Sequence, residues 1–445
     1  MKRIFALLFS LYVFVGSSFA ERVSEERVVR MAAEVCGGIS GKDFRQQASS
    51  VVSVSMNGTI CYYIVQFQPE GWALVAADDH SEPVLGYSSE GVFEQEAMPN
   101  SMKVWLNGYA KKILANKRNL VLHSHPKWEN PSYTLKAGGV QRIEPIIQVN
   151  WNQSGAYAKY CPVNNEGKRA LVGCVAVAMA QAMSVVRYPV HPVGLIAYED
   201  DDMGLVKVVF DKEPDYDWEQ ILSGADNKSE VARLLFHCGA ALRMDYGVNA
   251  SGAYLKNAPK SLKTYFSYPK SVAFYVRDSY QGDWKDLILS ELKEGRPVIY
   301  SGYDPMGSYG HAFNLDGYDG SNSFHINWGW GGKNNGYFSL DNLRDGKYDY
   351  RDAHQVVVGL KSEEAIETAI EELTGAIDVK VFTMKKQVVL LAEEVGDYAV
   401  YSISGTLYRK SEFGIGETRL TGLPSGGYVI VISSNGKQFV YKIRI

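Results

Sequence analysis

The alternation of apolar and polar residues divides the chain into regions of different character. Residues 51–91 combine short β-rich runs with turn-forming residues, and residues 102–114 have helical spacing. From about residue 146 to residue 360, apolar helical runs mix with strands rich in Tyr and Gly. Residues 378–445 change again, to short and evenly spaced strands separated by turns. The pattern predicts an α+β protein that ends in a small all-β sandwich.

The most apolar helical pattern starts at a cysteine. Between Cys174 and Val186 only Gln181 and Ser184 are strongly polar, and the pattern stops before Pro189. This predicts a buried helix that begins at Cys174 and is ended by the proline. The thiol would then lie in the first helical turn.

The first twenty residues have the pattern of a signal peptide. Two basic residues precede an uncharged apolar run at residues 4–15, and small residues follow up to Ala20. No later stretch reaches the ~18 uninterrupted apolar residues that a membrane-spanning helix requires. We therefore expect an exported protein without an integral membrane segment in its mature form.

Length, charge and cysteine content narrow the classes of function. A chain of 445 residues predicts two or three domains, and its net charge of −4, with both signs interspersed, gives no basic stripe for nucleic acid. Five cysteines without a CxxC motif fit neither a disulfide scaffold nor a zinc site. We expect free thiols, no metal, no cofactor and no nucleic-acid partner.

Cys174 has the surroundings of a reactive thiol. In the first turn of a helix, unpaired backbone N–H groups and the positive end of the helix dipole stabilise a thiolate. A lower thiol pKa makes the nucleophilic form more abundant, and Gly173 would let a substrate chain approach the sulfur. The alternative is that Cys174 is simply a small buried apolar residue, as many free cysteines are.

A nucleophilic thiol requires a base, and His311 is the best placed of the eight histidines. Two β-patterned runs on either side of residues 319–322 predict a hairpin, and His311 opens the first run. Gly310 would leave the imidazole accessible, while Trp328 and Trp330 would place aromatic faces beside it and exclude water. Five of the other seven lie in less suitable patterns: His123 and His125 in a linker, His80 and His191 beside turns, and His237 in a core helix.

The residue that orients His311 depends on the register of this hairpin. A symmetric four-residue turn places Trp328 opposite Phe313 and on the His311 face, so that Asn327 points away. A loop of three or five residues brings Asn327 round to His311, because a one-residue slip turns every side chain over. Asn327 and Trp328 therefore remain alternatives at this point.

Three stretches together resemble a known family. They are "VGCVAVAMAQ", "GHAFNLDGY" and "HINWGWGG", and the region from about residue 146 to residue 360 resembles the streptopain family of papain-like bacterial cysteine peptidases. Further upstream, "GWALVAADDHSEPVLGYSSEG" resembles the inhibitory pro-domain of that family. The last strands, with "GLPSGGY" and a closing basic strand, resemble the sorting domains of the type IX secretion system.

The resemblance implies a role for each site residue. Cys174 would be the nucleophile, and His311 the general base that becomes the general acid for the leaving amine. The Gln153 side chain and the Cys174 backbone N–H would hold the oxyanion. Asn327 is the natural orienting residue because papain uses an asparagine, with Trp328 as the alternative. The residues expected to flank the bound peptide are Ser251, Gly252, Gly310 and Trp330.

The resemblance also implies a division into domains. The expected parts are a signal peptide at residues 1–20, an inhibitory pro-domain at 21–136, a papain-like peptidase domain at 137–362, a linker at 363–377 and a β-sandwich sorting domain at 378–445. The polar junction between pro-domain and peptidase suits proteolytic nicking, and we expect cleavage near residues 135–138.

We expect a bacterial cysteine endopeptidase, secreted or attached to the cell surface, made as a zymogen and with a role in virulence. Its partners would be protein or peptide substrates, its own pro-domain and the secretion machinery. Two alternatives stay open: another Cys-His acyl transferase or an amidase acting on cell wall, and a non-catalytic surface adhesin that keeps the fold. An adhesin has no need to keep Cys174, His311 and Gln153 together.

Overall fold

The structure is a computed structural model, and it divides into two compact units with a boundary between residues 360 and 361. It describes residues 23–444 except for 45–46, 97, 119–123, 130–140, 224–228, 304–309, 341–343, 346–347, 350–353, 362–378, 385–386, 403–406, 424–426 and 435–436. The expected signal peptide, the expected cleavage at 135–138 and the linker at 363–377 lie outside the described residues.

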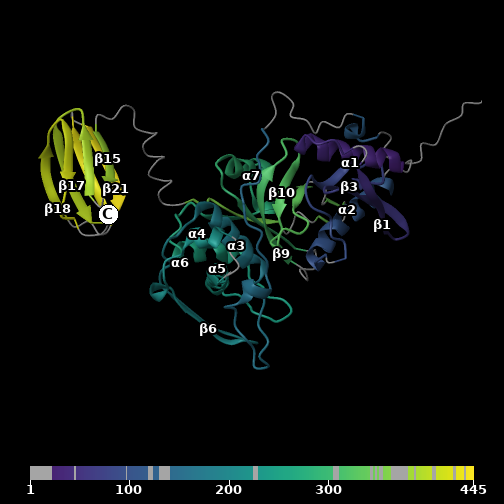
Figure 1. Ribbon diagram of the computed structural model, residues 1–445, viewed down its shortest axis with the longest axis horizontal. Coiled ribbons are helices and arrows are strands. Elements are labelled where there is room, and N and C mark those ends of the chain that lie inside the picture. Colours follow the sequence, from purple (N-terminus) through teal and green to yellow (C-terminus); the bar gives the residue numbers. More distant parts are fainter. Residues whose placement is uncertain are drawn as a thin grey trace, which may run out of the picture. The chain divides into compact units, whose positions relative to one another are not determined.

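The first unit begins with a helix packed on an antiparallel meander (Figure 1). The Ser24 side chain accepts a hydrogen bond from the N–H of Arg27 at the start of this helix, and Gly41 ends it in the left-handed conformation. The elements are α1 (Glu25–Ser40), β1 (Ala48–Met56), β2 (Thr59–Phe67), β3 (Trp72–Ala76), β4 (Val84–Ser88) and α2 (Asn100–Arg118). α2 confirms the helix predicted at residues 102–114.

The sheet of the meander continues beyond β4 into strands from the later part of the chain. β4 pairs antiparallel with β11 (Gly336–Ser339), with Tyr337 opposite Tyr87 and Phe338 opposite Gly86. One ten-stranded sheet results, in the order β1-β2-β3-β4-β11-β10-β9-β8-β14-β7. A Cβ on Gly86 would lie 2.5 Å from the Phe338 ring, so the missing side chain lets the ring lie against the strand. Two regions that the sequence predicted as separate domains are thus joined by backbone hydrogen bonds.

The rest of this unit supplies the other half of the sheet and the helices beside it. The remaining strands are β7 (Ala273–Val276), β8 (Val298–Tyr303), β9 (Gly310–Tyr318), β10 (Ser323–Asn327) and β14 (Gln355–Val358), with a separate hairpin of β5 (Leu195–Asp200) and β6 (Gly204–Val209) and the short pair β12 (Arg344–Asp345) and β13 (Tyr348–Asp349). The helices are α3 (Cys174–Val186), α4 (Trp218–Leu222), α5 (Ser229–Ala241), α6 (Ala258–Tyr265) and α7 (Trp284–Lys293).

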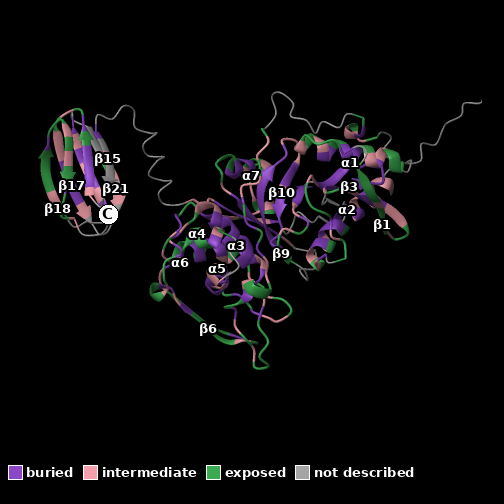
Figure 2. Cartoon of the chain, in the orientation of Figure 1, coloured by how far each residue is buried: buried purple, intermediate pink, exposed green. Residues whose placement is uncertain are grey.

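α3 confirms the helix predicted from the apolar run, including its first residue. It packs against β9 and α5, and all its residues from Val175 to Ser184 are buried (Figure 2). Arg187 ends the helix in the left-handed conformation, two residues before Pro189. The small alanine side chains allow the close packing of α3 on β9 that brings the sheet to the thiol.

The second unit is a β-sandwich. Its sheets have the orders β15-β16-β19 and β18-β17-β20-β21. The strands are β15 (Val379–Met384), β16 (Gln387–Ala392), β17 (Gly396–Ser402), β18 (Leu407–Phe413), β19 (Gly416–Leu420), β20 (Gly427–Ser434) and β21 (Lys437–Arg444). Val388 from one sheet and Val400 and Ile430 from the other are fully buried in one core. The predicted all-β sandwich, and with the first unit the α+β class, are confirmed.

In the part of the chain that the structure describes, no helix combines the length and the apolar character needed to cross a bilayer.

Candidate active site

Cys174 is the first residue of α3, and the chain enters the helix through a glycine that the packing requires. Gly173 has φ +87°, and a Cβ there would lie 2.7 Å from the Met244 side chain and 3.2 Å from the Ser251 carbonyl oxygen. The sequence interpretation gave Gly173 the role of leaving room for substrate. In the structure that room is filled by Met244, so the glycine serves the entry into the helix.

The thiol lies between opposing influences on its pKa. Burial raises the pKa of the Cys174 thiol, while the backbone N–H groups of Ala312, Val175 and Cys174 itself act to lower it. Burial is the larger effect, so the thiol keeps its proton in this state. The Ala312 contact also places the sulfur against β9, one residue along the chain from His311.

His311 lies near the start of β9 in an aromatic environment. Its ring stacks on that of Trp330, with the ring centroids 4.6 Å apart. Trp330 in turn stacks on Trp328, with centroids 5.2 Å apart and the two rings almost parallel. His311 Nε2 lies 2.8 Å from the Trp328 carbonyl oxygen. A carbonyl can only accept a hydrogen bond, so Nε2 carries the proton and Nδ1 keeps its lone pair. The side chain that the sequence predicted as accessible is only 8% exposed.

Burial lowers the pKa of His311 to about 4, and the hydrogen bond to the Trp328 carbonyl, the smaller effect, acts in the opposite direction. The imidazole is therefore neutral at pH 7. His311 and Phe313 share one face of β9, whereas Ala312 faces the core that contains α3. Within the described residues, no hydrogen bond joins the imidazole to Cys174 Sγ. The base and the nucleophile are close in the fold but not engaged.

The register of the hairpin is decided by a bulge. A five-residue loop pairs Phe324 with Tyr318, a register that by itself would turn Asn327 toward His311. Asp316 is then left out of the pairing, and beyond it Asn327 lies opposite Asn314. The extra residue turns the alternation over once more.

The two alternatives for the orienting residue are therefore placed differently. The carbonyl of Trp328 meets the imidazole. The Asn327 side chain instead donates to the Val149 carbonyl at 3.1 Å and accepts from Gln181 Nε2 at 3.1 Å and from the Gly329 N–H at 3.2 Å. Asn327 touches the segment that carries Trp328, not the His311 ring.

Gln153 lies beside the entry into α3. Its carbonyl accepts from the N–H of Val172 at 2.9 Å, two residues before Cys174, and its N–H donates to Asn152 Oδ1 at 2.7 Å. The side chain is half-buried and makes no hydrogen bond within the described residues. Its amide is thus available to a ligand at the start of α3.

The expected peptide-flanking residues are distributed around the same region. Ser251 Oγ donates to the Leu171 carbonyl at 2.8 Å and accepts from the Gly247 N–H at 3.0 Å, so its hydroxyl holds the loop beside Cys174. Gly252 is exposed, with open space where a Cβ would stand. Gly310 is exposed at the first position of β9.

Known proteins resemble two parts of this chain. Residues 151–338 match the Peptidase C10 family, and residues 21–113 match the Spi protease inhibitor family. Streptopain from Streptococcus pyogenes is 27% identical over 396 residues, which cover 78% of this chain and 94% of streptopain. The thiol protease/hemagglutinin PrtT from Porphyromonas gingivalis is 30% identical over 367 residues, which cover 75% of this chain but only 41% of PrtT.

A solved structure shows the same architecture. A fragment of prointerpain A from Prevotella intermedia is similar with a TM-score of 0.57 and 27% identity, over 71% of this chain and 99% of the fragment. The chain belongs to the peptidase C10 (streptopain) family. As a member of this family it is a cysteine protease with an inhibitory pro-domain, built on the papain-like zymogen fold.

The C10 pro-domain reaches the surroundings of His311 through an aromatic residue that the sequence interpretation missed. The ring centroid of Trp105, in α2, lies 5.7 Å from that of Phe313, 5.8 Å from that of Trp328 and 6.0 Å from that of His354. The Trp105 and His354 rings are stacked. In the sequence, Trp105 is recognisable only as an apolar position of a predicted helix. A local pattern cannot predict contacts with residues more than 200 positions away along the chain.

A second pro-domain contact holds the segment after Trp328. Asn334 Oδ1 accepts from the Glu94 N–H at 2.8 Å, and its Nδ2 lies 3.3 Å from the Glu94 carbonyl. Lys333 Nζ lies 2.6 Å from the Glu94 carboxylate. Since the Trp328 indole donates to the Asn334 carbonyl at 3.0 Å, this clasp also fixes the tryptophan beside the imidazole.

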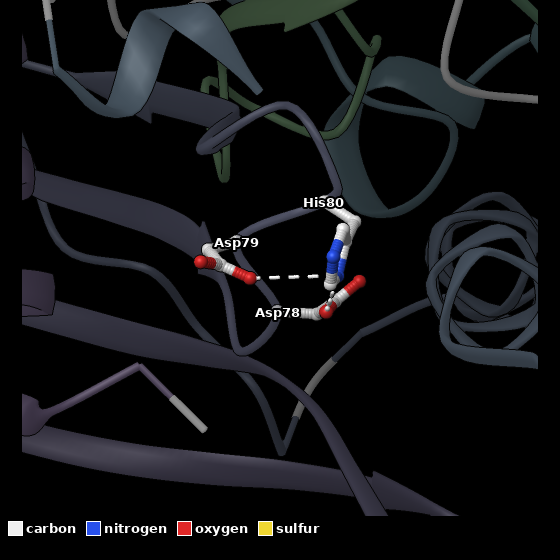
Figure 3. A group of neighbouring side chains, drawn as sticks. All are labelled: Asp78, Asp79 and His80. Carbon is white, nitrogen blue, oxygen red and sulfur yellow. Dashed lines mark hydrogen bonds and ion pairs between the residues drawn. The ribbon is translucent and has the colours of Figure 1, made fainter. Parts of the chain in front are cut away.

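An acidic cluster of the pro-domain binds the chain that leads toward the peptidase domain. His80 Nδ1 lies 3.2 Å from Asp78 Oδ1 and 3.4 Å from Asp79 Oδ1, with the side chains directed toward one another (Figure 3). Ser124 Oγ donates to Asp79 Oδ2 at 2.8 Å, and the His125 N–H donates to the Asp79 carbonyl at 2.7 Å. We assign the cluster to anchoring this segment.

The lowered pKa of His311 predicts a loss of stability in acid. As pH falls from 6.5 toward 4, the unfolded chain protonates His311 while the buried imidazole does not, so the free energy of unfolding decreases. The contribution is about 3 kcal/mol once both states are protonated. The His311→Phe substitution, which keeps the stacking, should remove this part of the pH dependence.

Urea unfolding followed by tryptophan fluorescence would measure it, in a Cys174→Ala background that prevents self-digestion. All eight tryptophans lie before residue 361, so the signal reports the first unit. The same pH dependence with and without the His311→Phe substitution would contradict the assignment.

Proposed function

We propose that this protein is a secreted endopeptidase, produced in a latent form, that cleaves peptide bonds of protein substrates with Cys174 and His311. The observation that carries the proposal is the position of the thiol. Sγ lies at the first turn of α3 and against the amide of Ala312, next to a histidine whose Nδ1 is free to accept a proton. The start of a helix stabilises a thiolate, and an adjacent base takes up the proton of the thiol. Together they activate a cysteine as a nucleophile.

The proposed reaction starts when the Cys174 thiol gives its proton to His311 Nδ1. The thiolate attacks the substrate carbonyl carbon, and the oxyanion is held by the Cys174 N–H and the Gln153 amide. Collapse breaks the C–N bond, and His311 donates its proton to the leaving amine. Water then attacks the thioester with His311 as base, which releases the acid product and restores the thiol.

Latency follows from the position of the imidazole. The ring is neutral, bound to the Trp328 carbonyl and stacked on Trp330, and it makes no bond to the sulfur. Trp105 and Glu94 of the pro-domain support the aromatic residues that hold it. Removal of the pro-domain would release Trp330 and residues 331–335. The imidazole, still bonded through Nε2 to the Trp328 carbonyl, could then turn Nδ1 to the thiol, and both groups could become charged.

Cleavage between the two domains is the proposed activation step. On one side Trp128 is buried and its indole donates to the Ser81 carbonyl at 2.9 Å. On the other side Ile143 exchanges two backbone hydrogen bonds of 2.8 Å with Tyr318 of β9. Both flanks are bound to their own domains, so we place the cut within residues 130–140, which includes the expected 135–138.

Loss of Cys174 should abolish the activity. The mature Cys174→Ala protein is expected to show no hydrolysis of casein or of unfolded peptides, because no thioester can form. Iodoacetamide should label Cys174 and silence the wild type, and EDTA should leave it active. The buried Cys238→Ala variant is a matched control and should retain activity. Casein hydrolysis by Cys174→Ala at the wild-type rate would rule out the proposed nucleophile.

Weakening the pro-domain clasp should speed activation. Asn334→Gly keeps the positive φ of this position and removes the two hydrogen bonds to Glu94. Losing about two net hydrogen bonds should increase conversion about tenfold. Both the variant and its Glu96→Ala control carry Cys174→Ala, so that only a trace of added mature enzyme cuts them. Gel densitometry and N-terminal sequencing give the rate and the site, and unchanged half-times would exclude a clasp.

The sandwich is proposed to serve export or surface attachment, and it contains none of the proposed reacting groups. A chain that ends at residue 361 should therefore keep its kcat and KM on peptides within about twofold after activation. In the native host the same truncation should leave the protein in the periplasm, as measured by fractionation and immunoblotting. Normal release of the truncated chain would remove the sorting role while leaving the peptidase proposal intact.

A further inference from the structure

Three buried amide side chains connect the elements that carry the proposed reacting groups. Gln181 of α3, Asn314 of β9 and Asn327 at the end of β10 are at most 2% exposed. Asn314 Nδ2 lies 3.1 Å from Gln181 Oε1, and Gln181 Nε2 lies 3.1 Å from Asn327 Oδ1. A continuous chain of amides thus crosses from one strand to the next by way of the helix.

Each amide stands at a fixed offset from a residue of the site. Gln181 follows Cys174 by two helical turns and lies on the same face of α3. Asn314 is three residues beyond His311 on β9. Asn327 directly precedes Trp328, whose carbonyl meets the imidazole. The network therefore fixes the helix of the nucleophile against the strand of the base.

The network also determines where the Trp328 carbonyl points. Asn327 Oδ1 accepts the Gly329 N–H at 3.2 Å, so the side chain bridges the backbone on both sides of Trp328. Asn327 Nδ2 donates to the Val149 carbonyl at 3.1 Å, and Gln181 Nε2 lies 3.4 Å from the same oxygen. Val149 precedes the segment that contains Gln153. Bonds from Gln181 therefore reach the strand of His311, the residue before Trp328 and the segment that leads to Gln153.

Stability alone does not account for these residues. An apolar core residue at position 181 would bury as much surface without the cost of removing an amide from water. Asn314 Oδ1 is a buried acceptor without a hydrogen-bond partner among the described residues. A network that leaves such a group without a partner lowers the stability of the fold. This favours the interpretation that the network serves to position the residues of the site.

We propose that Gln181 and Asn314 are positioning residues for catalysis, which hold Asn327 so that the Trp328 carbonyl orients His311 toward Cys174. The inference rests on the proposed function, because it assigns a task only if this pair performs the reaction. Both residues act through others and touch neither substrate nor the reacting atoms. The geometry set by the amides is retained when the pro-domain leaves, since every member belongs to the peptidase domain.

Gln181→Met tests the inference, because methionine fills the same volume without hydrogen bonds. The full-length variant is cleaved by a trace of wild-type enzyme and its active sites are counted by iodoacetamide labelling. We expect kcat to fall tenfold to a hundredfold with KM within threefold of the wild type. The rate of Cys174 alkylation at pH 5–6 should fall in parallel, because it reports thiolate that is formed by proton transfer to His311.

Ser184→Ala is the matched control. Its hydroxyl is buried on the same helix and bonds only the Gln181 carbonyl within the described residues, so it removes a core hydrogen bond outside the amide chain. It should keep kcat and the alkylation profile within twofold. Gln181→Glu is the conservative variant, since a protonated carboxyl both donates and accepts, and at pH 6 it should restore kcat to within about threefold of the wild type.

The outcomes separate this inference from the proposed function. Activity in Cys174→Ala would remove the proposed function itself. With a Cys174-dependent wild type, the positioning role is overturned if Gln181→Met keeps kcat and the alkylation profile, if Ser184→Ala loses as much, or if Gln181→Glu is as impaired as Gln181→Met. Should Gln181→Met fail to fold, Asn314→Ala breaks the same chain from β9, and wild-type kcat in that variant overturns the proposal equally.

Discussion

The pairing of β4 with β11 is the contact on which the latent arrangement depends. An open strand edge exposes unpaired N–H and C=O groups, and here each domain covers the edge of the other. β11 follows directly on the segment that contains Trp328 and Trp330, so strand pairing fixes this segment together with the sheet. Glu94 and Trp105 add side-chain contacts to the same region. One interface thereby sets both the docking of the pro-domain and the environment of His311.

That environment acts on the two reacting groups by one physical cause. Burial raises the pKa of the Cys174 thiol and lowers the pKa of His311, because in each case the charged form loses its water. A thiolate and an imidazolium can exist together in a buried site only when each faces the other and replaces that water. In the latent state the ring is stacked on Trp330 and makes no hydrogen bond to the thiol, so both groups lack this compensation although the molecule stays folded.

The polar residues inside α3 show how catalysis and packing share one helix. Gln181 and Ser184 are the strongly polar positions of an otherwise apolar run, and both are buried. Ser184 closes a bond to the Gln181 carbonyl, which satisfies the hydroxyl within the helix. The Gln181 side chain instead leaves the helix and bonds two strands. A buried polar residue in an apolar helix, when its side chain makes no hydrogen bond within that helix, therefore indicates a contact with another element.

Local pattern by itself determined the start of α3 at Cys174, the hairpin that begins near His311 and the all-β nature of residues 378–445, because periodicity and turn chemistry act over a few residues. Only the tertiary structure decided which residue meets the imidazole. The bulge at Asp316 is held by His325 at 2.6 Å and by the Ile147 N–H at 3.1 Å, and it reverses the register that the loop alone would give. Alternation with a period of two shows which residues share a face of a strand, but it does not show which strand pairs with it. Neither this register nor the β4–β11 pairing can therefore be predicted from the local sequence.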